Sequence, residues 1–569
     1  MSLSDPETIE NSVNESRRCV LGVLAGLGIG STVLHRAIAA QTRQGATITI
    51  ETIKQAEWIA GLELSDEERA TTAATVARAV HGYDELRQVA LDNSVPPAIA
   101  FDPTPGQRPS PQGERGTVKL SESNAAPKPK TEEDLAFLPV TELAALVRSR
   151  QVTSLELTKL YLARLKRFDP LLKCVVTLTE ELAIQQAKRA DREIAAGQYR
   201  GPLHGIPWGA KDLISHPGYP TTWGAKPFEK QTIDTKATVA QRLEDAGAVL
   251  VAKLTLGALA MGDKWFGGMT RNPWNPKEGS SGSSAGPASA TAAGLVGFSI
   301  GSETRGSIVS PSRRCGTTGL RPTFGRVSRH GCMTLSWSMD KLGPITRSVE
   351  DCALVFGAIH GHDGLDPSAV DRPFDWPGRR NLSTLRIGYF ENGTPIDQRA
   401  DLKTLRDLGV KLKPIELPSD PPAGPVGVIL TTEAAAVFDE LTRKGITEGL
   451  NSWPRIFRAA QFVPAVEYLR ANRVRTLLMR KMAELFHDID AYVNGDDLGL
   501  TNLTGHPTVI LPDGLTQRGG VEVTTSITFT GQLNDETNLL SLAHAYQQAT
   551  GHHLRRPPVE KWLQAEGEK

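Results

Sequence analysis

The residues with the clearest chemical capacity in this chain are one lysine and two serines, each beside glycines. Lys211 lies in a segment that starts at Gly201, and the serines lie in the runs 279–286 and 301–307. An amine base, a bridging hydroxyl and a nucleophilic hydroxyl together form a Ser-Ser-Lys arrangement for acyl transfer. Such an arrangement cleaves amides without a metal, a catalytic histidine or a cofactor, and we expect neither a metal nor a cofactor here.

The sequence around Lys211 favours an uncharged amine. A serine hydroxyl is a poor nucleophile until a neighbouring base takes its proton, and lysine can be that base when burial lowers its pKa. Asp212 is the adjacent formal charge, and the other neighbours are apolar: Leu203, Ile206, Pro207, Trp208, Ala210, Leu213 and Ile214. We therefore expect Lys211 to be buried and neutral in the resting protein.

The order and spacing of the serine runs resemble the core of the amidase signature family. That core reads Gly-Gly-Ser-Ser-Gly-Gly-Ser, then an Ala/Gly-rich helix, then Gly-Thr-Asp-Thr-Gly-Gly-Ser-Ile-Arg. Ser283 and Ser307 are 24 positions apart, which is the family's spacing between the bridging serine and the nucleophile, and residues 288–294 supply the small-residue helix. The resemblance implies that Ser307 is the nucleophile, Ser283 the bridge and Lys211 the base.

The similarity extends along most of the chain, from about Asp134 to Lys561. It continues through the segments 315–331 and 339–351 and into the late segment 502–514. A Gly/Ser-rich run taken alone is usually a linker, and a lone lysine is usually on the surface. The joint order of the three groups argues against both interpretations here. Cys315, by contrast, is interpreted as a packed core residue.

The loop before Ser307 is expected to bind the oxyanion. Backbone N–H groups of Thr304, Arg305, Gly306 and Ser307 are expected to bind the oxyanion of the tetrahedral intermediate. Arg305 replaces the family's usual glycine, and Glu303 replaces its aspartate. Arg305 either destabilises a loop that needs glycine's backbone freedom, or its guanidinium shapes the pocket or binds an acidic group of the substrate. Neither residue is a reacting group, so the expected mechanism stands.

Charge and cysteine content narrow the class of protein. Lys and Arg number 64, as do Asp and Glu, so the formal net charge is zero and attraction to nucleic acid is not expected. The five cysteines have no Cys-x-x-Cys spacing, and we expect neither a metal site nor a disulfide framework. The expected partner is a small-molecule or peptide amide substrate. A homo-oligomer is left open.

Residues 1–39 resemble a twin-arginine export signal. Arg17 and Arg18 precede a mildly apolar run that ends near Leu34, and Ala37-Ile-Ala39 has the form of a cleavage site. Cleavage there leaves a mature chain that starts near Ala40, in the periplasm or otherwise exported. A retained membrane anchor and a chance Arg-Arg pair, with a cytoplasmic protein, are the alternatives.

The rest of the chain divides by composition into three parts. Residues 40–95 have helical periodicity, with a capping box at Ser65–Glu68, and form a small N-terminal appendage. Residues 96–133 are rich in proline and form a linker. From 134 to 566, strands alternate with helices, which predicts an α/β catalytic domain. The family resemblance sharpens this to a three-layer α/β/α sandwich around a large mixed sheet.

Three functions from different classes are compatible with these features. The leading hypothesis is an amidase that hydrolyses carboxylic amides through an acyl-enzyme. The alternative is the glutamine-hydrolysing A subunit of the tRNA-dependent amidotransferase, a role that is cytoplasmic and needs partner subunits. The third is a non-catalytic binding protein on an amidase scaffold, against which the intact Lys211, Ser283 and Ser307 argue. The residues do not name the substrate.

Overall fold

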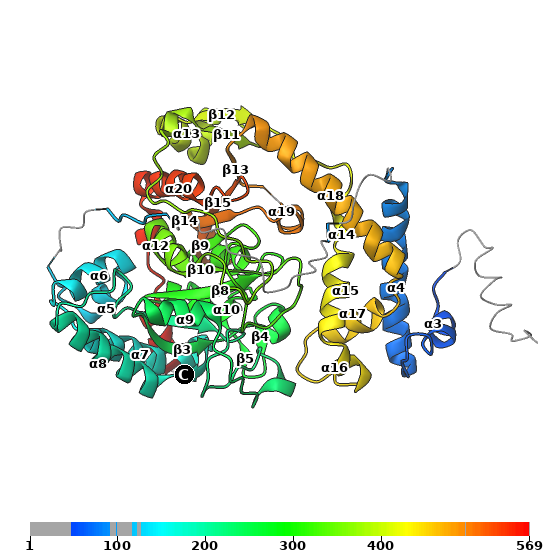
Figure 1. Cartoon of the computed structure of the whole chain (residues 1–569), viewed down its shortest axis with the longest axis horizontal. Helices are drawn as coiled ribbons and strands as arrows, with labels where there is room; N and C mark the ends of the chain where they lie inside the picture. Colours follow the sequence, from blue (N-terminus) through cyan, green and yellow to red (C-terminus); the bar gives the residue numbers. More distant parts are fainter. Residues whose placement is uncertain (1–46, 92–97, 100–115, 122–126, 496, 568–569) are drawn as a thin grey trace, which may run out of the picture. The chain divides into compact units, whose positions relative to one another are not determined.

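The chain divides into two compact units, residues 1–81 and residues 82–569. The computed structural model describes residues 47–91, 98–99, 116–121, 127–495 and 497–567 (Figure 1). The export signal predicted at residues 1–39 lies outside the described residues, as does much of the proline-rich stretch. Within the described ranges, no helix is both long and apolar enough to cross a membrane.

The first unit contains α3 (Ile50–Ala56) and the start of α4 (Asp66–Gln88). The capping box predicted before α4 is present: Ser65 N–H donates to Glu68 at 2.9 Å, and Glu68 N–H donates to the Ser65 hydroxyl at 3.3 Å. Arg69 on α4 binds both carboxylate oxygens of Glu57, at 2.9 and 2.7 Å. This pair links α4 to the turn that follows α3.

The second unit is built on an eleven-stranded mixed sheet. Its strands in spatial order are β1 (Val175–Leu178), β3 (Val249–Leu254), β2 (Pro207–Lys211), β8 (Phe298–Glu303), β10 (Lys341–Thr346), β9 (Thr318–Arg321), β14 (Thr508–Arg518), β15 (Val521–Gly531), β13 (Ala491–Val493), β11 (Arg386–Tyr389) and β12 (Lys411–Pro414). Two small ribbons lie outside it: β4 (Lys264–Trp265) with β5 (Gly268–Met269), and β6 (Arg271–Asn272) with β7 (Asn275–Gly279).

Helices cover both faces of this sheet, which confirms the predicted three-layer sandwich. The helices that follow α4 along the chain are α5 (Glu132–Ala136), α6 (Val140–Arg148), α7 (Ser154–Leu172), α8 (Glu180–Ala195), α9 (Thr238–Asp245), α10 (Ala285–Ala292), α11 (Val309–Cys315), α12 (Val349–Ile359), α13 (Ala400–Asp407), α14 (Ala423–Val426), α15 (Val428–Val437), α16 (Asp439–Arg443), α17 (Trp453–Ala460), α18 (Ala465–Asp488), α19 (Leu498–Thr504), α20 (Glu536–Thr550) and α21 (Val559–Gly567). Of these, α15 packs against α17 and α18, and α16 packs against α17. Helices α7 and α8 pack against β3, and α13 packs against β12 (Figure 1).

The three strands nearest the lysine are parallel and buried along their whole length. Strand β2 lies between β3 and β8 and is parallel to both. Every residue of these strands is buried, as expected for a parallel sheet covered on both faces. Because β2 and β8 are parallel, their carboxyl ends meet at the same edge of the sheet, where open α/β sheets bind their ligands.

Helix α10 is the small-residue helix predicted between the two serine runs. All eight of its residues are buried. The small side chains are needed because the backbone of a neighbouring segment is close: a Cβ on Gly286 would lie 2.4 Å from the Thr255 nitrogen and 2.5 Å from the Cys174 carbonyl oxygen. The helix starts directly after Ser284, and both Ser283 and Ser284 are fully buried.

Candidate active site

Lys211 is the last residue of β2, at the edge of the sheet where β8 also ends. Its side chain is fully buried. The Nζ atom lies 2.8 Å from the Ser283 hydroxyl, 2.8 Å from the Ser302 hydroxyl and 3.1 Å from the Ser284 hydroxyl. The structure therefore places the predicted base in direct contact with the predicted bridging serine.

The surroundings of Lys211 favour its neutral form. Burial lowers the pKa of Lys211 to about 7, and the more distant carboxylates of Asp340 and Glu303 oppose this shift. The adjacent Asp212 is bound to Lys253, 2.7 Å away, and both side chains are fully buried. With a pKa near 7, a large fraction of the amine is unprotonated at neutral pH and can accept a proton.

Ser307 lies on the loop between β8 and α11. Its carbonyl oxygen accepts a hydrogen bond from the Ser284 N–H at 3.0 Å, so the loops that carry the two serines are in contact. Its side chain is 9% exposed. Among the described residues, the Ser307 hydroxyl has no hydrogen-bond partner, and the relay bond expected between Ser307 and Ser283 is not formed. In this structure Ser307 therefore contacts the Ser283–Ser284 loop through its backbone carbonyl and not through its hydroxyl.

The loop before Ser307 has the geometry of an oxyanion site. Gly306 adopts a φ of 89°, in the left-handed region that favours glycine. The N–H groups of Ile308 and Val309 are occupied by Glu303, at 2.8 and 3.0 Å. Within the described ranges, the N–H groups of Arg305, Gly306 and Ser307 have no acceptor. They are therefore available to a developing oxyanion.

Glu303 fixes this loop through a buried network. Besides the two loop N–H groups, its carboxylate accepts from Arg321 at 2.8 Å and from Asn502 at 2.8 Å. Burial alone would raise the pKa of Glu303, but the Arg321 guanidinium and these hydrogen bonds lower it to about 2. A charged carboxylate with hydrogen bonds to both oxygens therefore holds the start of α11 and the loop that carries Ser307 together.

Thr304 anchors the same loop from its other side. Its hydroxyl donates to Asp340 at 2.6 Å, and the second Asp340 oxygen accepts from the N–H groups of Leu335 and Ser336, at 2.8 and 3.0 Å. Burial raises the pKa of Asp340, which these hydrogen bonds partly offset. The side chain of Thr304 is thereby committed to structure, which leaves the backbone as its contribution to an oxyanion site.

Arg305 does not strain the loop. Its φ is not positive, so the position does not require glycine. The side chain is exposed and, together with Leu417, Leu498 and Leu500, lines a cavity of about 590 Å³. Of the two alternatives left open by the sequence, this geometry favours a guanidinium that shapes a pocket next to the loop of Ser307, the predicted nucleophile.

The sequence motifs did not predict that Ser302 and Ser284 also contact Lys211. The Ser302 hydroxyl contacts the amine as closely as Ser283 does, and Ser284 donates to the Ser302 carbonyl at 3.1 Å. Both residues lie inside the two serine runs, so the motifs pointed to this region without indicating that these side chains contact Lys211. Their role could be seen only once the pairing of β2 with β8 placed Ser302 beside Lys211.

Comparison with known proteins identifies the family. The family model described as Amidase matches residues 156–494. The protein named "Putative amidase AmiD" of Mycobacterium tuberculosis H37Rv is 36% identical over 478 residues, which cover 77% of this chain and 100% of that protein. The A subunit of glutamyl-tRNA(Gln) amidotransferase from Roseiflexus sp. is 34% identical over 483 residues, which cover 73% of this chain and 97% of that subunit.

Among solved structures, the native peptide amidase of Stenotrophomonas maltophilia matches with a TM-score of 0.64 and 30% identity, covering 74% of this chain and 98% of that one. The match thus extends over nearly the whole length of that enzyme. Together with the mixed sheet and its flanking helices, these similarities show that the chain belongs to the amidase signature family and is an amide-hydrolysing enzyme.

Proposed function

We propose that the chain hydrolyses carboxylic amides through an acyl-enzyme on Ser307, with Ser283 as the bridge and Lys211 as the base. The observation that carries this proposal is the fully buried Lys211 amine, with a pKa near 7, at 2.8 Å from the Ser283 hydroxyl. An unprotonated amine at this distance can accept the proton of the Ser283 hydroxyl. The unoccupied N–H groups of the Arg305–Ser307 loop support the same assignment.

In the first half of the reaction, Ser307 Oγ attacks the carbonyl carbon of the amide. Its proton passes to Ser283 Oγ while the proton of Ser283 passes to Lys211 Nζ. The carbonyl π electrons move to the oxygen, which the loop N–H groups bind. When the tetrahedral intermediate collapses, the C–N bond breaks, and the leaving nitrogen takes the proton back from Lys211 through Ser283.

In the second half, a water molecule attacks the Ser307 ester. Its proton follows the same path to Lys211, the C–Oγ bond breaks, and Ser307 regains a proton as the carboxylic acid leaves. The free Ser307 hydroxyl must turn toward Ser283 for either half-reaction. Because apo enzymes often form such hydrogen bonds only with substrate bound, the missing relay bond is compatible with this scheme.

A panel of amides assayed for release of ammonia or amine tests the proposal. The panel contains aliphatic and aryl amides, C-terminal peptide amides because the Stenotrophomonas relative is a peptide amidase, and glutamine alone. We expect hydrolysis of at least one of the first three classes, and none by Ser307→Ala. Hydrolysis of glutamine alone would support the amidotransferase subunit, which the 34% identity to that family keeps as the second candidate.

We further propose that the enzyme is exported by a twin-arginine signal at residues 1–39. The support is the Arg17-Arg18 pair, the mildly apolar run and Ala37-Ile-Ala39. Export of this kind carries folded proteins. The four cysteines among the described residues are free, so folding before the protein crosses the membrane would require no disulfide between them. N-terminal sequencing of the protein from fractionated cells decides the point, since the proposal requires a mature chain that starts near Ala40.

A further inference from the structure

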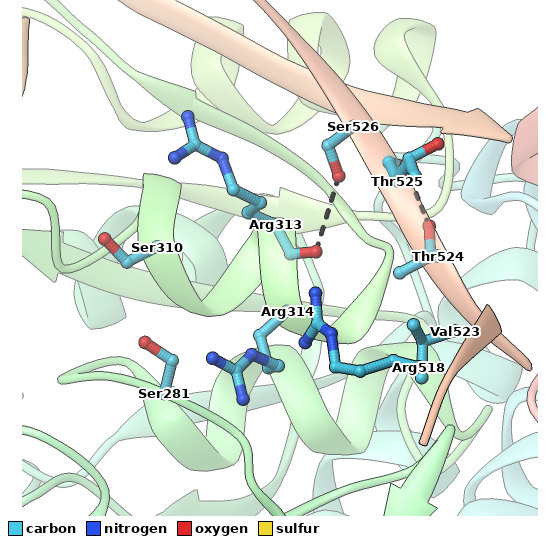
Figure 2. A pocket seen from close by; sticks show the side chains of 9 residues that line it. All are labelled: Ser281, Ser310, Arg313, Arg314, Arg518, Val523, Thr524, Thr525 and Ser526. Atoms are coloured by element: carbon cyan, nitrogen blue, oxygen red, sulfur yellow. Dashed lines mark hydrogen bonds between the residues drawn. The ribbon is translucent and has the colours of Figure 1, made fainter. Parts of the chain in front are cut away.

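A second cavity lies next to both serine loops, and three arginines line it (Figure 2). It has a volume of about 410 Å³. Arg313 and Arg314 come from α11, and Arg518 comes from the end of β14, in the hairpin with β15. Ser281 and Ser310 complete the side toward the active site. We call this cavity the arginine pocket.

The arginine pocket has more positive charge than nearby carboxylates balance. Glu278 Oε2 lies 3.2 Å from Arg314 and 3.7 Å from Arg518, so one carboxylate is shared by two guanidinium groups. Arg313 is exposed, and its guanidinium has no acidic partner among the residues that the structure describes. Asp263, outside the lining, binds the Ser281 N–H at 2.9 Å. A cavity with such an excess attracts anions.

The hydrogen-bonding groups of the pocket also suit an anion. Guanidinium groups present donors in a planar fork that matches a carboxylate. Within the described part of the chain, the hydroxyls of Ser281 and Ser310 have no hydrogen-bond partner. On the hairpin side, Thr524 donates to the Thr525 carbonyl at 2.9 Å, and Ser526 donates to the Arg313 carbonyl at 3.4 Å (Figure 2). These two bonds hold the wall without using the arginine side chains.

The pocket is within reach of a substrate bound at Ser307. Ser310 N–H donates to the Gly306 carbonyl at 2.7 Å, so Ser310 is one helical turn beyond the nucleophile. Ser281 precedes the bridging Ser283 by two residues. Arg314 lies five residues beyond Val309, where α11 begins, which is roughly 8 Å at 1.5 Å rise per residue, and Ser307 is two residues before Val309. An acidic group held by the arginines would therefore be on the order of 10 Å from the scissile carbonyl.

We propose that the arginine pocket binds a carboxylate of the amide substrate, and that preferred substrates are amides with an acidic group several bonds from the scissile carbonyl. This inference rests on the proposed function of Ser307. The arginine side chains supply the recognition, and Glu278, shared by Arg314 and Arg518, reduces the net positive charge of the pocket.

Kinetics on a matched pair of substrates tests the proposal. The pair is the monoamide of suberic acid and the linear alkyl amide of the same length that ends in a methyl group. We expect a higher kcat/KM for the acid, and we expect Arg313→Gln and Arg518→Gln each to reduce the acid-to-neutral ratio about tenfold, the loss of one charge-assisted contact. Arg555→Gln, an exposed arginine elsewhere in this unit, is the control and should not change the ratio.

A gain-of-function variant excludes misfolding as the explanation. Glu278→Gln removes the carboxylate that Arg314 and Arg518 share, and we expect it to raise the preference for the acid severalfold. If the ratio is unchanged in Arg313→Gln, Arg518→Gln and Glu278→Gln, the proposal is wrong. It is equally wrong if Arg305→Gln abolishes the preference and the other two arginine variants do not, because the acid then lies in the cavity beside Arg305.

Direct binding separates this inference from the proposed function. Suberate, which cannot be hydrolysed, is titrated into the Ser307→Ala protein by calorimetry, with and without Arg313→Gln. If suberate binding depends on Arg313 but the wild-type protein hydrolyses no amide, the arginine pocket is upheld and the proposed function is refuted. Hydrolysis of amides with neither suberate binding nor a preference for the acid refutes the pocket alone.

Discussion

The ionisation of Lys211 makes stability depend on pH in a way that a single substitution removes. Burial lowers the pKa of this amine from 10.5 to about 7. Between these two values, the unfolded chain binds a proton at Lys211 that the folded protein does not bind. The free energy of unfolding therefore rises with pH in this interval, by about 1.4 kcal/mol per unit. The contribution is complete above pH 10.5 and is lost as pH falls to about 7.

Replacement by methionine gives an apolar side chain of similar length that does not titrate. From pH 7.5 to 9.5, the wild-type protein should gain about 3 kcal/mol relative to Lys211→Met. The three serine hydroxyls that lose a partner in the variant add an offset that does not vary with pH in this range. Lys341, whose pKa burial also lowers, is present in both proteins and cancels.

Urea unfolding of both proteins at pH 7.5, 8.5 and 9.5 measures this difference. At each pH, the unfolding free energy of the variant is subtracted from that of the wild type, and the change of this difference with pH is compared with the prediction. Both proteins must unfold in one transition at each pH. Parallel pH dependences would mean that Lys211 is protonated throughout the range. That result would refute the assignment of Lys211 as a base that is neutral at rest.

Three other consequences follow from the site and the N-terminus. For a substrate that does not titrate, kcat/KM should fall about tenfold per pH unit below pH 7, as Lys211 is protonated, and a pH–rate profile would show a flat acid limb if it were not the base. Glu303→Ala leaves Arg321 buried without its partner and should lower the unfolding free energy by about 3–5 kcal/mol, with a much smaller loss in Glu303→Asp; urea unfolding checks both. Lys-Lys in place of Arg17-Arg18 should retain the protein in the cytoplasm, which cell fractionation would contradict if the variant were exported like the wild type.

The residues to which we assign the chemistry could be chosen from the sequence because their signal is local. Lys211, Ser283 and Ser307 lie in short glycine-rich motifs, and the family spacing between the serines is preserved. The helix between them could be predicted from its small residues, and the α/β core from the alternation of strands and helices. The large mixed sheet was predicted from the family resemblance. The capping box at Ser65–Glu68 could be predicted for the same reason, because its pattern lies within four consecutive residues.

The supporting network could not be predicted because its members are distant in sequence. Glu303 is joined by Asn502, 199 positions away, and nothing in either segment alone indicates the other. The arginine pocket likewise combines α11 with the end of β14. The role of Arg305 depended on a backbone angle: a positive φ would have made arginine a source of strain, and the observed conformation does not.

Covalent labelling of Ser307 tests the central claim most directly. The wild-type enzyme is treated with a fluorophosphonate, digested and mapped by mass spectrometry, with Ser307→Ala and Lys211→Met in parallel. The account predicts one adduct, on Ser307, formed more slowly in Lys211→Met because the serine then lacks its base. An adduct on another serine, or an equally labelled Ser307→Ala protein that still hydrolyses amides, would contradict it.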